Sequence, residues 1–110
     1  MANTIKNAGQ LIGATSTVIY TVPASTSVVL HGAWFANLHA SNQQTVTVTW
    51  TDSSAGSPEV EHTILNNVPI PVNDTLIFDK PLNLETGDIL KASCSSANDV
   101  EATLAFVEFT

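Results

Sequence analysis

The chain has 110 residues, of which 44% are hydrophobic and only 12% are charged, and its formal net charge at pH 7 is −7. Its basic residues are three lysines, too few to neutralise a row of phosphates, which argues against nucleic acid or an anionic membrane surface as a partner. A chain of this length forms one domain and buries one hydrophobic core without a metal or a disulfide.

The first ten residues differ from the rest of the chain. Residues 1–10 contain Ile5 as their only large apolar residue besides the initiator Met, and they lack clean alternation. We therefore expect an N-terminal arm (1–10) followed by a single β domain (11–110). The arm is either a frayed terminus or a segment that orders when it lies against a neighbouring subunit, with Ile5 as its contact.

Residues 11–110 carry the patterns of short β-strands. Residues 45–51 read Thr-Val-Thr-Val-Thr-Trp-Thr, and this alternation of β-branched residues is typical of a half-buried strand. Similar runs between turn residues predict about eight strands: residues 18–22, 28–30, 34–38, 45–51, 59–65, 75–78, 89–94 and 100–110. No segment holds a helical period. The pattern predicts an all-β fold, a single antiparallel β-sandwich, with Tyr20, Trp50, Leu90, Leu104 and Phe106 in one core.

Two places break the rule that one face of each strand is apolar. Trp34 and Phe35 are adjacent and project to opposite faces, and Trp34 is in phase with two further apolar residues. Val107 and Phe109 lie on the face of the last strand opposite its expected core residues. On a surface with few charges, these residues predict an interface with another subunit or a partner. Its candidate residues are Ile5, Phe35, Val107 and Phe109.

Side chains capable of catalysis or metal binding show no suitable spacing. His31, His39 and His62 match no zinc-binding motif and are expected to be exposed. Glu59 and Glu61 face the same side of one strand, which is typical of a charged edge strand. We expect no catalytic residues, no metal and no cofactor, and we do not expect an enzyme.

Two further features have a functional and a structural interpretation. Cys94 is the only cysteine and alternates with the apolar face of a strand, which indicates a buried, unreactive thiol and no internal disulfide. Trp34, Trp50 and Tyr20 could form a sugar-stacking platform, but Trp50 and Tyr20 are in phase with valines, which favours the core. The N-terminus lacks the apolar stretch of a secretory signal, which predicts synthesis in the cytoplasm.

Four motifs occur in order along the chain: residues 18–26 (Val-Ile-Tyr-Thr-Val-Pro-Ala-Ser-Thr), 45–54 (ending Thr-Asp-Ser-Ser), 68–71 (Val-Pro-Ile-Pro) and 84–90 (Leu-Glu-Thr-Gly-Asp-Ile-Leu). Together they resemble small β-sandwich virion proteins of tailed bacteriophages. The resemblance implies a jelly-roll-like sandwich that forms a homo-oligomer, with a trimer expected, and attaches to the head or tail of the particle. It supplies no catalytic residues.

The leading hypothesis is a capsid decoration (cement) protein, which stabilises the head by binding between capsid subunits as a homo-oligomer. Its partners would be further copies of itself and the major capsid protein, and its location would be the virion, after synthesis in the host cytoplasm. The alternative is a receptor-binding or glycan-binding module of a tail or fibre. An enzyme, such as a cupin-like metalloprotein, ranks third.

Overall fold

The computed structural model describes residues 2–53 and 58–110, and within them it contains nine strands and no helix. The strands are β1 (Asn3–Ile12), β2 (Thr17–Thr21), β3 (Ser27–Asn37), β4 (Gln44–Asp52), β5 (Val60–Ile70), β6 (Thr75–Phe78), β7 (Leu82–Leu84), β8 (Ile89–Cys94) and β9 (Val100–Phe109). This part of the chain accordingly offers no helix that could cross a bilayer. The all-β prediction is confirmed.

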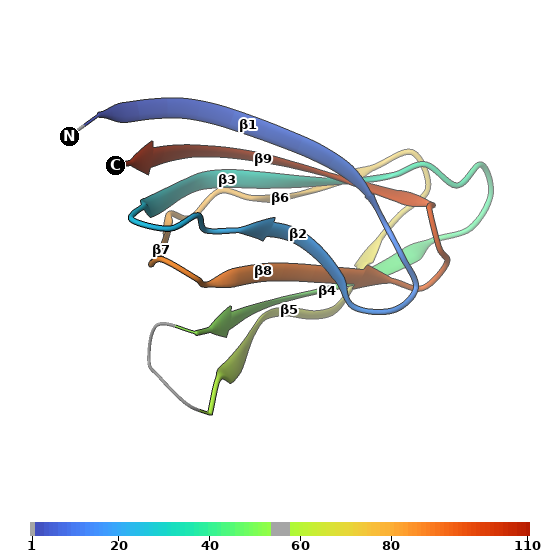
Figure 1. Ribbon diagram of the computed structural model, residues 1–110. Helices are drawn as coiled ribbons and strands as arrows, with labels where there is room; N and C mark the ends of the chain where they lie inside the picture. The colour runs from blue at the N-terminus through green and yellow to red at the C-terminus, as the bar shows by residue number, and fades with distance from the viewer. Residues whose placement is uncertain (1, 54–57) are drawn as a thin grey trace.

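The strands form two antiparallel sheets that pack face to face. The first sheet has the order β1-β9-β3-β6, with β7 also paired to β3, and the second sheet has the order β2-β8-β4-β5. In Figure 1, β1, β9 and β3 lie in the upper layer, and β8, β4 and β5 lie in the lower one. β6 and β7 pair with successive parts of β3. Counted as one interrupted strand, they complete the eight-stranded jelly-roll order.

The hydrophobic core lies between the two sheets. Alternate residues of β9 are buried, Leu104 and Phe106 among them, and Leu90 of β8 meets them from the second sheet. Tyr20 and Trp50 are half-buried and pack against this cluster. All five residues predicted for the core therefore contribute to it, and Tyr20 and Trp50 lie at its margin.

A β-bulge in β3 reverses the expected orientation of Trp34 and Phe35. Leu30 pairs with Phe106 but Gly32 pairs with Ala105, so one extra residue is inserted between them. Because side chains alternate with a period of two, one extra residue moves every later side chain to the other face. Phe35 is thus 1% exposed in the core, and Trp34 is 38% exposed outside. The prediction that Phe35 is an interface residue is wrong.

The N-terminal segment forms an edge strand of the first sheet. Residues 3–12, most of which were expected to be an arm, pair with β9 in an uninterrupted antiparallel register. Their side chains are exposed on both faces, apart from Ala8 and Ile12. Backbone pairing with β9 and not burial of an apolar face thus positions β1, which explains why the segment shows no alternation.

Asp88 caps the turn between β7 and β8 from a buried position. It is 1% exposed, and its carboxylate accepts hydrogen bonds from the backbone N–H groups of Glu85 (2.9 Å) and Ser53 (3.1 Å). The first bond closes the turn around Gly87, which has a φ of 87°. The second holds the end of β4 against the turn. Aspartate is favoured in turns because its side chain can cap the local backbone, and Asp88 does so here.

We expect Asp88→Ala to lower the free energy of unfolding by about 1–3 kcal/mol, because it removes the acceptor of two part-buried backbone N–H groups. Chemical denaturation monitored by tryptophan fluorescence would measure this loss. Asp79→Ala is the matched control, since Asp79 is an exposed aspartate next to the neighbouring turn. Equal stabilities of the two variants would contradict the capping role.

Candidate interaction site

Apolar side chains predominate on the outer face of the first sheet, which also carries the polar residues Asn3, Asn7 and Thr103. On β9 the residues that alternate with the core, Val107 and Phe109 among them, point away from it. Ile5 of β1 and Val29 of β3 flank Val107 as its direct cross-strand partners. We define the apolar face by these residues and their outward neighbours: Ile5, Val29, Trp34, Ile77, Ala105, Val107 and Phe109.

The two most distinctive side chains of the apolar face lie across adjacent strands. Trp34 of β3 is directly opposite Ile77 of β6, which is 58% exposed. A β-carbon added at Gly32 would lie 3.5 Å from the Trp34 ring. The indole therefore covers the bulge at Gly32, where no side chain separates it from the sheet. One side of the Trp34 ring packs against the backbone of β3, and the other side is exposed.

Charge is scarce on the apolar face. Glu101 lies at one end of it, between Leu11 and Ala36 in the register of the sheet. Lys6 and Glu108, although on the same strands, point to the opposite side. A surface with this composition gains free energy when it is removed from water, because few charges must be desolvated.

The outer face of the second sheet has the opposite character. Its β4 residues are threonines, and Lys91 of β8 forms an ion pair with Glu61 of β5 at 3.6 Å. A shallow hollow of about 220 Å³ lies on this side, lined by Ser16, Thr47, Thr49, Glu61, Ala92 and Ser93. The sandwich is thus apolar on one outer face and rich in hydroxyl groups on the other.

A polar network joins β1 to both sheets. Glu108 of β9 is 6% exposed and accepts a hydrogen bond from the Tyr20 hydroxyl at 2.6 Å. Its other carboxylate oxygen lies 2.9 Å from Nζ of Lys6. The hydrogen bond from Tyr20 and then that from Lys6 lower the pKa of Glu108. Burial, and then the Glu108 carboxylate, raise the pKa of the Tyr20 phenol.

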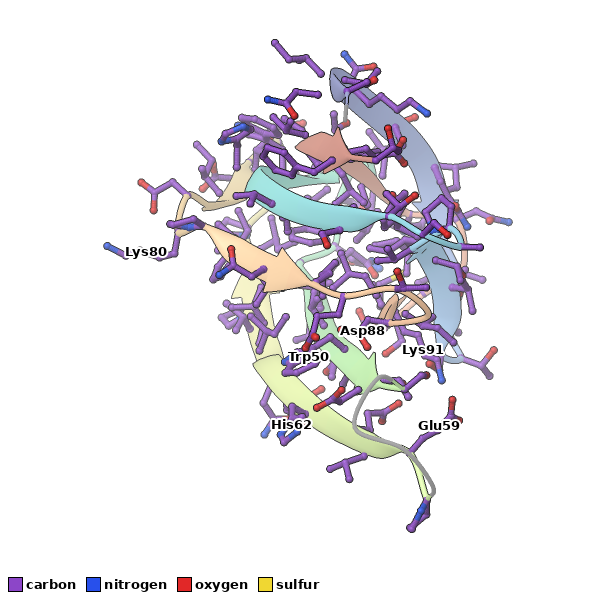
Figure 2. All side chains as sticks on the ribbon, turned by 60° about the vertical axis from the view of Figure 1, so that its left-hand side comes forward. Trp50, Glu59, His62, Lys80, Asp88 and Lys91 are labelled. Carbon is purple, nitrogen blue, oxygen red and sulfur yellow. The ribbon has the colours of Figure 1, made fainter. Side chains whose placement is uncertain are left out.

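The three aromatic residues considered for a sugar platform are not together. Tyr20 packs inside against Phe106, with ring centroids 4.6 Å apart, and Trp34 lies on the apolar face. Trp50 stacks on the exposed His62 of β5, with centroids 4.8 Å apart, and Figure 2 shows this pair at the end of the second sheet. Trp34, Trp50 and Tyr20 therefore do not form a single sugar-stacking platform.

The remaining candidates lie apart from one another. His31 is exposed at the bulge of β3, and His39 is half-buried and accepts hydrogen bonds from the backbone N–H groups of Ser41 and Asn42. Glu59 accepts a hydrogen bond from Ser53, whereas Glu61 forms an ion pair with Lys91. Across residues 2–53 and 58–110, no three His, Cys, Asp or Glu side chains gather into a metal-binding group. Absence of metal and of catalysis stays a prediction.

Three of the four predicted interface residues come together. Ile5 and Val107 are cross-strand partners, and Phe109 follows on the same face of β9. Sequence reasoning missed Val29, Trp34 and Ile77. Trp34 takes the outward position predicted for Phe35 because of the bulge, for which Gly32 between two apolar runs is a signal in the sequence. Cys94 is buried as predicted, and its thiol donates to the carbonyl of Ser96 at 3.1 Å.

The sequence matches no protein-family model and shows no significant similarity to a curated protein. In three dimensions the chain is similar to a chain of the capsid of Helicobacter pylori bacteriophage KHP30. The TM-score is 0.59 at 13% identity, over 100% of this chain and 89% of that one. A second similarity is to a subunit of the disulfide-linked pili that form Bacillus endospore appendages, with a TM-score of 0.56 at 12% identity, over 99% of this chain and 87% of that one.

A third similarity is to a chain of the T13 particle of the virus IBDV, with a TM-score of 0.62 at 6% identity. It covers 96% of this chain, which spans only 30% of the IBDV chain. At these identities the similarities establish a shared fold. The fold is a jelly-roll sandwich that also occurs in viral capsid proteins, consistent with the resemblance to virion proteins.

Proposed function

We propose that this chain is a structural protein of a virion, a decoration protein of a tailed-phage head that binds between capsid subunits through the apolar face. The observation that carries the proposal is the contrast between the two outer faces of the sandwich. A protein that coats a particle needs one face that loses water on the shell and another that stays in water. The apolar face and the hydroxyl-rich face of the second sheet meet these two needs.

The similarity to a chain of the KHP30 capsid supports this proposal, because the two chains match over nearly their whole lengths. The similar pilus subunit comes from a disulfide-linked assembly. Linking copies head to tail by disulfides requires two accessible cysteines in each copy. These 110 residues contain one, Cys94, which is 6% exposed. A disulfide-linked filament is therefore disfavoured relative to a non-covalent coat.

The size of the apolar face bears on how attachment would work. With a rise of about 3.3 Å per residue and a spacing of about 4.8 Å between strands, the sheet presents on the order of 600 Å². Stable interfaces bury about 800 Å² per partner. One copy would thus bind weakly, and a homo-oligomer would bind more firmly because several faces engage at once. The resemblance implies a trimer, and no catalytic step is part of the proposed function.

The second candidate is the receptor-binding or glycan-binding module of a tail or fibre. The hydroxyl-lined hollow on the second sheet favours it, since hydroxyl groups and the Glu61 carboxylate can hydrogen-bond to a sugar. Binding would then depend on that hollow and not on the apolar face.

We expect Trp34→Glu to weaken binding to phage heads at least tenfold, because binding would bury a charge in the apolar contact. The measurement is co-sedimentation of purified protein with heads of the encoding phage assembled without this protein. Thr47→Glu is the matched control, placed on the hydroxyl-rich face. Loss of head binding only in Thr47→Glu would contradict attachment through the apolar face. Absence of the chain from purified virions by mass spectrometry would contradict both.

A further inference from the structure

The sandwich has four edges, and β1 is the one without protection against pairing with another chain. In the second sheet, β5 contains Pro69, Asn67 at a φ of 50° and two register shifts, all of which disrupt an edge. β2 is five residues long with a shift of its own, and β6 and β7 have four and three residues. β1 has ten residues, no proline and no register shift.

The free edge of β1 presents a regular series of backbone groups. Ala2 exchanges both backbone hydrogen bonds with Thr110, at 3.1 and 2.9 Å. In an antiparallel ladder such pairs occur at every second residue, so the even-numbered residues of β1 bond to β9. The odd-numbered residues direct their N–H and C=O groups away from the sheet: Asn3, Ile5, Asn7, Gly9 and Leu11. These groups match the edge of another strand.

Charge favours a second copy of the chain as that strand. All ten acidic residues lie between Asp52 and Glu108, so a chain with a net charge of −7 contains none in its first 51 residues. The single charge of β1 is Lys6, which points inward and pairs with Glu108. Two copies that repel elsewhere can thus approach each other along β1.

We infer that β1 pairs antiparallel with β1 of a second copy about a two-fold axis at Asn7. In this register Asn7 lies opposite its own equivalent, and Ile5 lies opposite Gly9 of the second copy. All five odd-numbered residues then form backbone hydrogen bonds. Gly9, which has no side chain, leaves room beside Ile5, which is 85% exposed in the single chain. A register centred on Lys6 would oppose two lysines and is disfavoured.

This pairing deepens the proposed function, on which its biological role rests. A two-fold axis perpendicular to the sheet turns both apolar faces in the same direction. The paired sheets then present about twice the area of one, beyond the roughly 800 Å² per partner typical of stable interfaces. The geometry favours an even number of copies over the trimer that the resemblance implies.

The test compares Asn7→Pro with Asn7→Ala in the isolated protein. Both lose the side chain, but only proline removes the outward N–H, and it leaves the bonds to β9 intact because the N–H of Asn7 points away from β9. Sedimentation equilibrium should give two chains per particle for the parent and for Asn7→Ala, and one for Asn7→Pro. Circular dichroism and the melting temperature confirm that Asn7→Pro is folded. A parent that is monomeric, or an Asn7→Pro that is still dimeric, would overturn the inference.

Amide hydrogen exchange provides a residue-level measurement. The N–H groups of Ile5, Asn7 and Gly9 should exchange more slowly as the protein concentration rises, while those of exposed turns do not change. Fast exchange at all concentrations would overturn the pairing. Trp34→Glu should still form dimers, because Trp34 does not lie on the free edge of β1. Loss of the dimer in this variant would mean that the copies associate through the apolar face, and it would overturn the pairing. These measurements use isolated protein and are independent of the head-binding assay. A protein that is monomeric here but binds heads in that assay would refute the pairing and leave the proposed function standing.

Discussion

Replacing Phe35 by alanine should lower the free energy of unfolding by about 3–5 kcal/mol, the range for truncating a buried aromatic side chain. Phe35 is 1% exposed and lines the core between the sheets with Leu30, Val48 and Leu90. The adjacent Trp34→Ala should cost less, because Trp34 is 38% exposed and contacts the sheet with one side of its ring. Urea denaturation followed by circular dichroism measures both.

This pair of variants tests the bulge in β3 directly. Without the extra residue between Leu30 and Gly32, Trp34 would face the core and the order of the two losses would be reversed. A larger loss for Trp34→Ala than for Phe35→Ala would therefore contradict the orientation of the two side chains. It would also remove Trp34 from the apolar face.

Replacing Glu108 by alanine should lower the free energy of unfolding by about 1.5–3 kcal/mol at neutral pH, the range for a hydrogen bond to a charged group. The change removes the acceptor of the Tyr20 hydroxyl and the partner of Lys6. Most of the loss should come from the bond to Tyr20, because the Lys6 side chain is 49% exposed and such ion pairs contribute little. Tyr20→Phe should show most of the same loss.

The contribution of Glu108 should disappear in acid. Its pKa is lowered in the folded protein, mainly by the hydrogen bond from Tyr20. Such a group contributes stability that is fully present above the unfolded pKa of about 4.3 and is lost as the pH falls through the folded pKa. The stability difference between the parent and Glu108→Gln should thus be constant from pH 7 to 5 and shrink below pH 4. A difference independent of pH would show that the charge of Glu108 does not stabilise the fold.

Local patterns in the sequence determined the fold class and most of the core. The alternation of residues 45–51 identified a strand with valines inside and threonines outside, and β4 has that arrangement. The turn at Gly87 and Asp88, the buried Cys94 and the outward Val107 and Phe109 were also predictable. In each case a residue's immediate neighbours are sufficient, because strand periodicity and turn conformation are short-range properties.

Only the tertiary structure decided how the strands assemble the candidate site. β1 has no apolar pattern, so only the backbone bonds to β9, about a hundred residues later in the chain, show that it belongs to the sheet. The bulge at His31 and Gly32 depends on how β3 pairs with β9. It places Trp34 on the apolar face and Phe35 in the core. The network of Lys6, Tyr20 and Glu108 joins three strands that are distant in sequence. Register between strands is set by contacts along their whole length, and a local pattern does not contain those contacts.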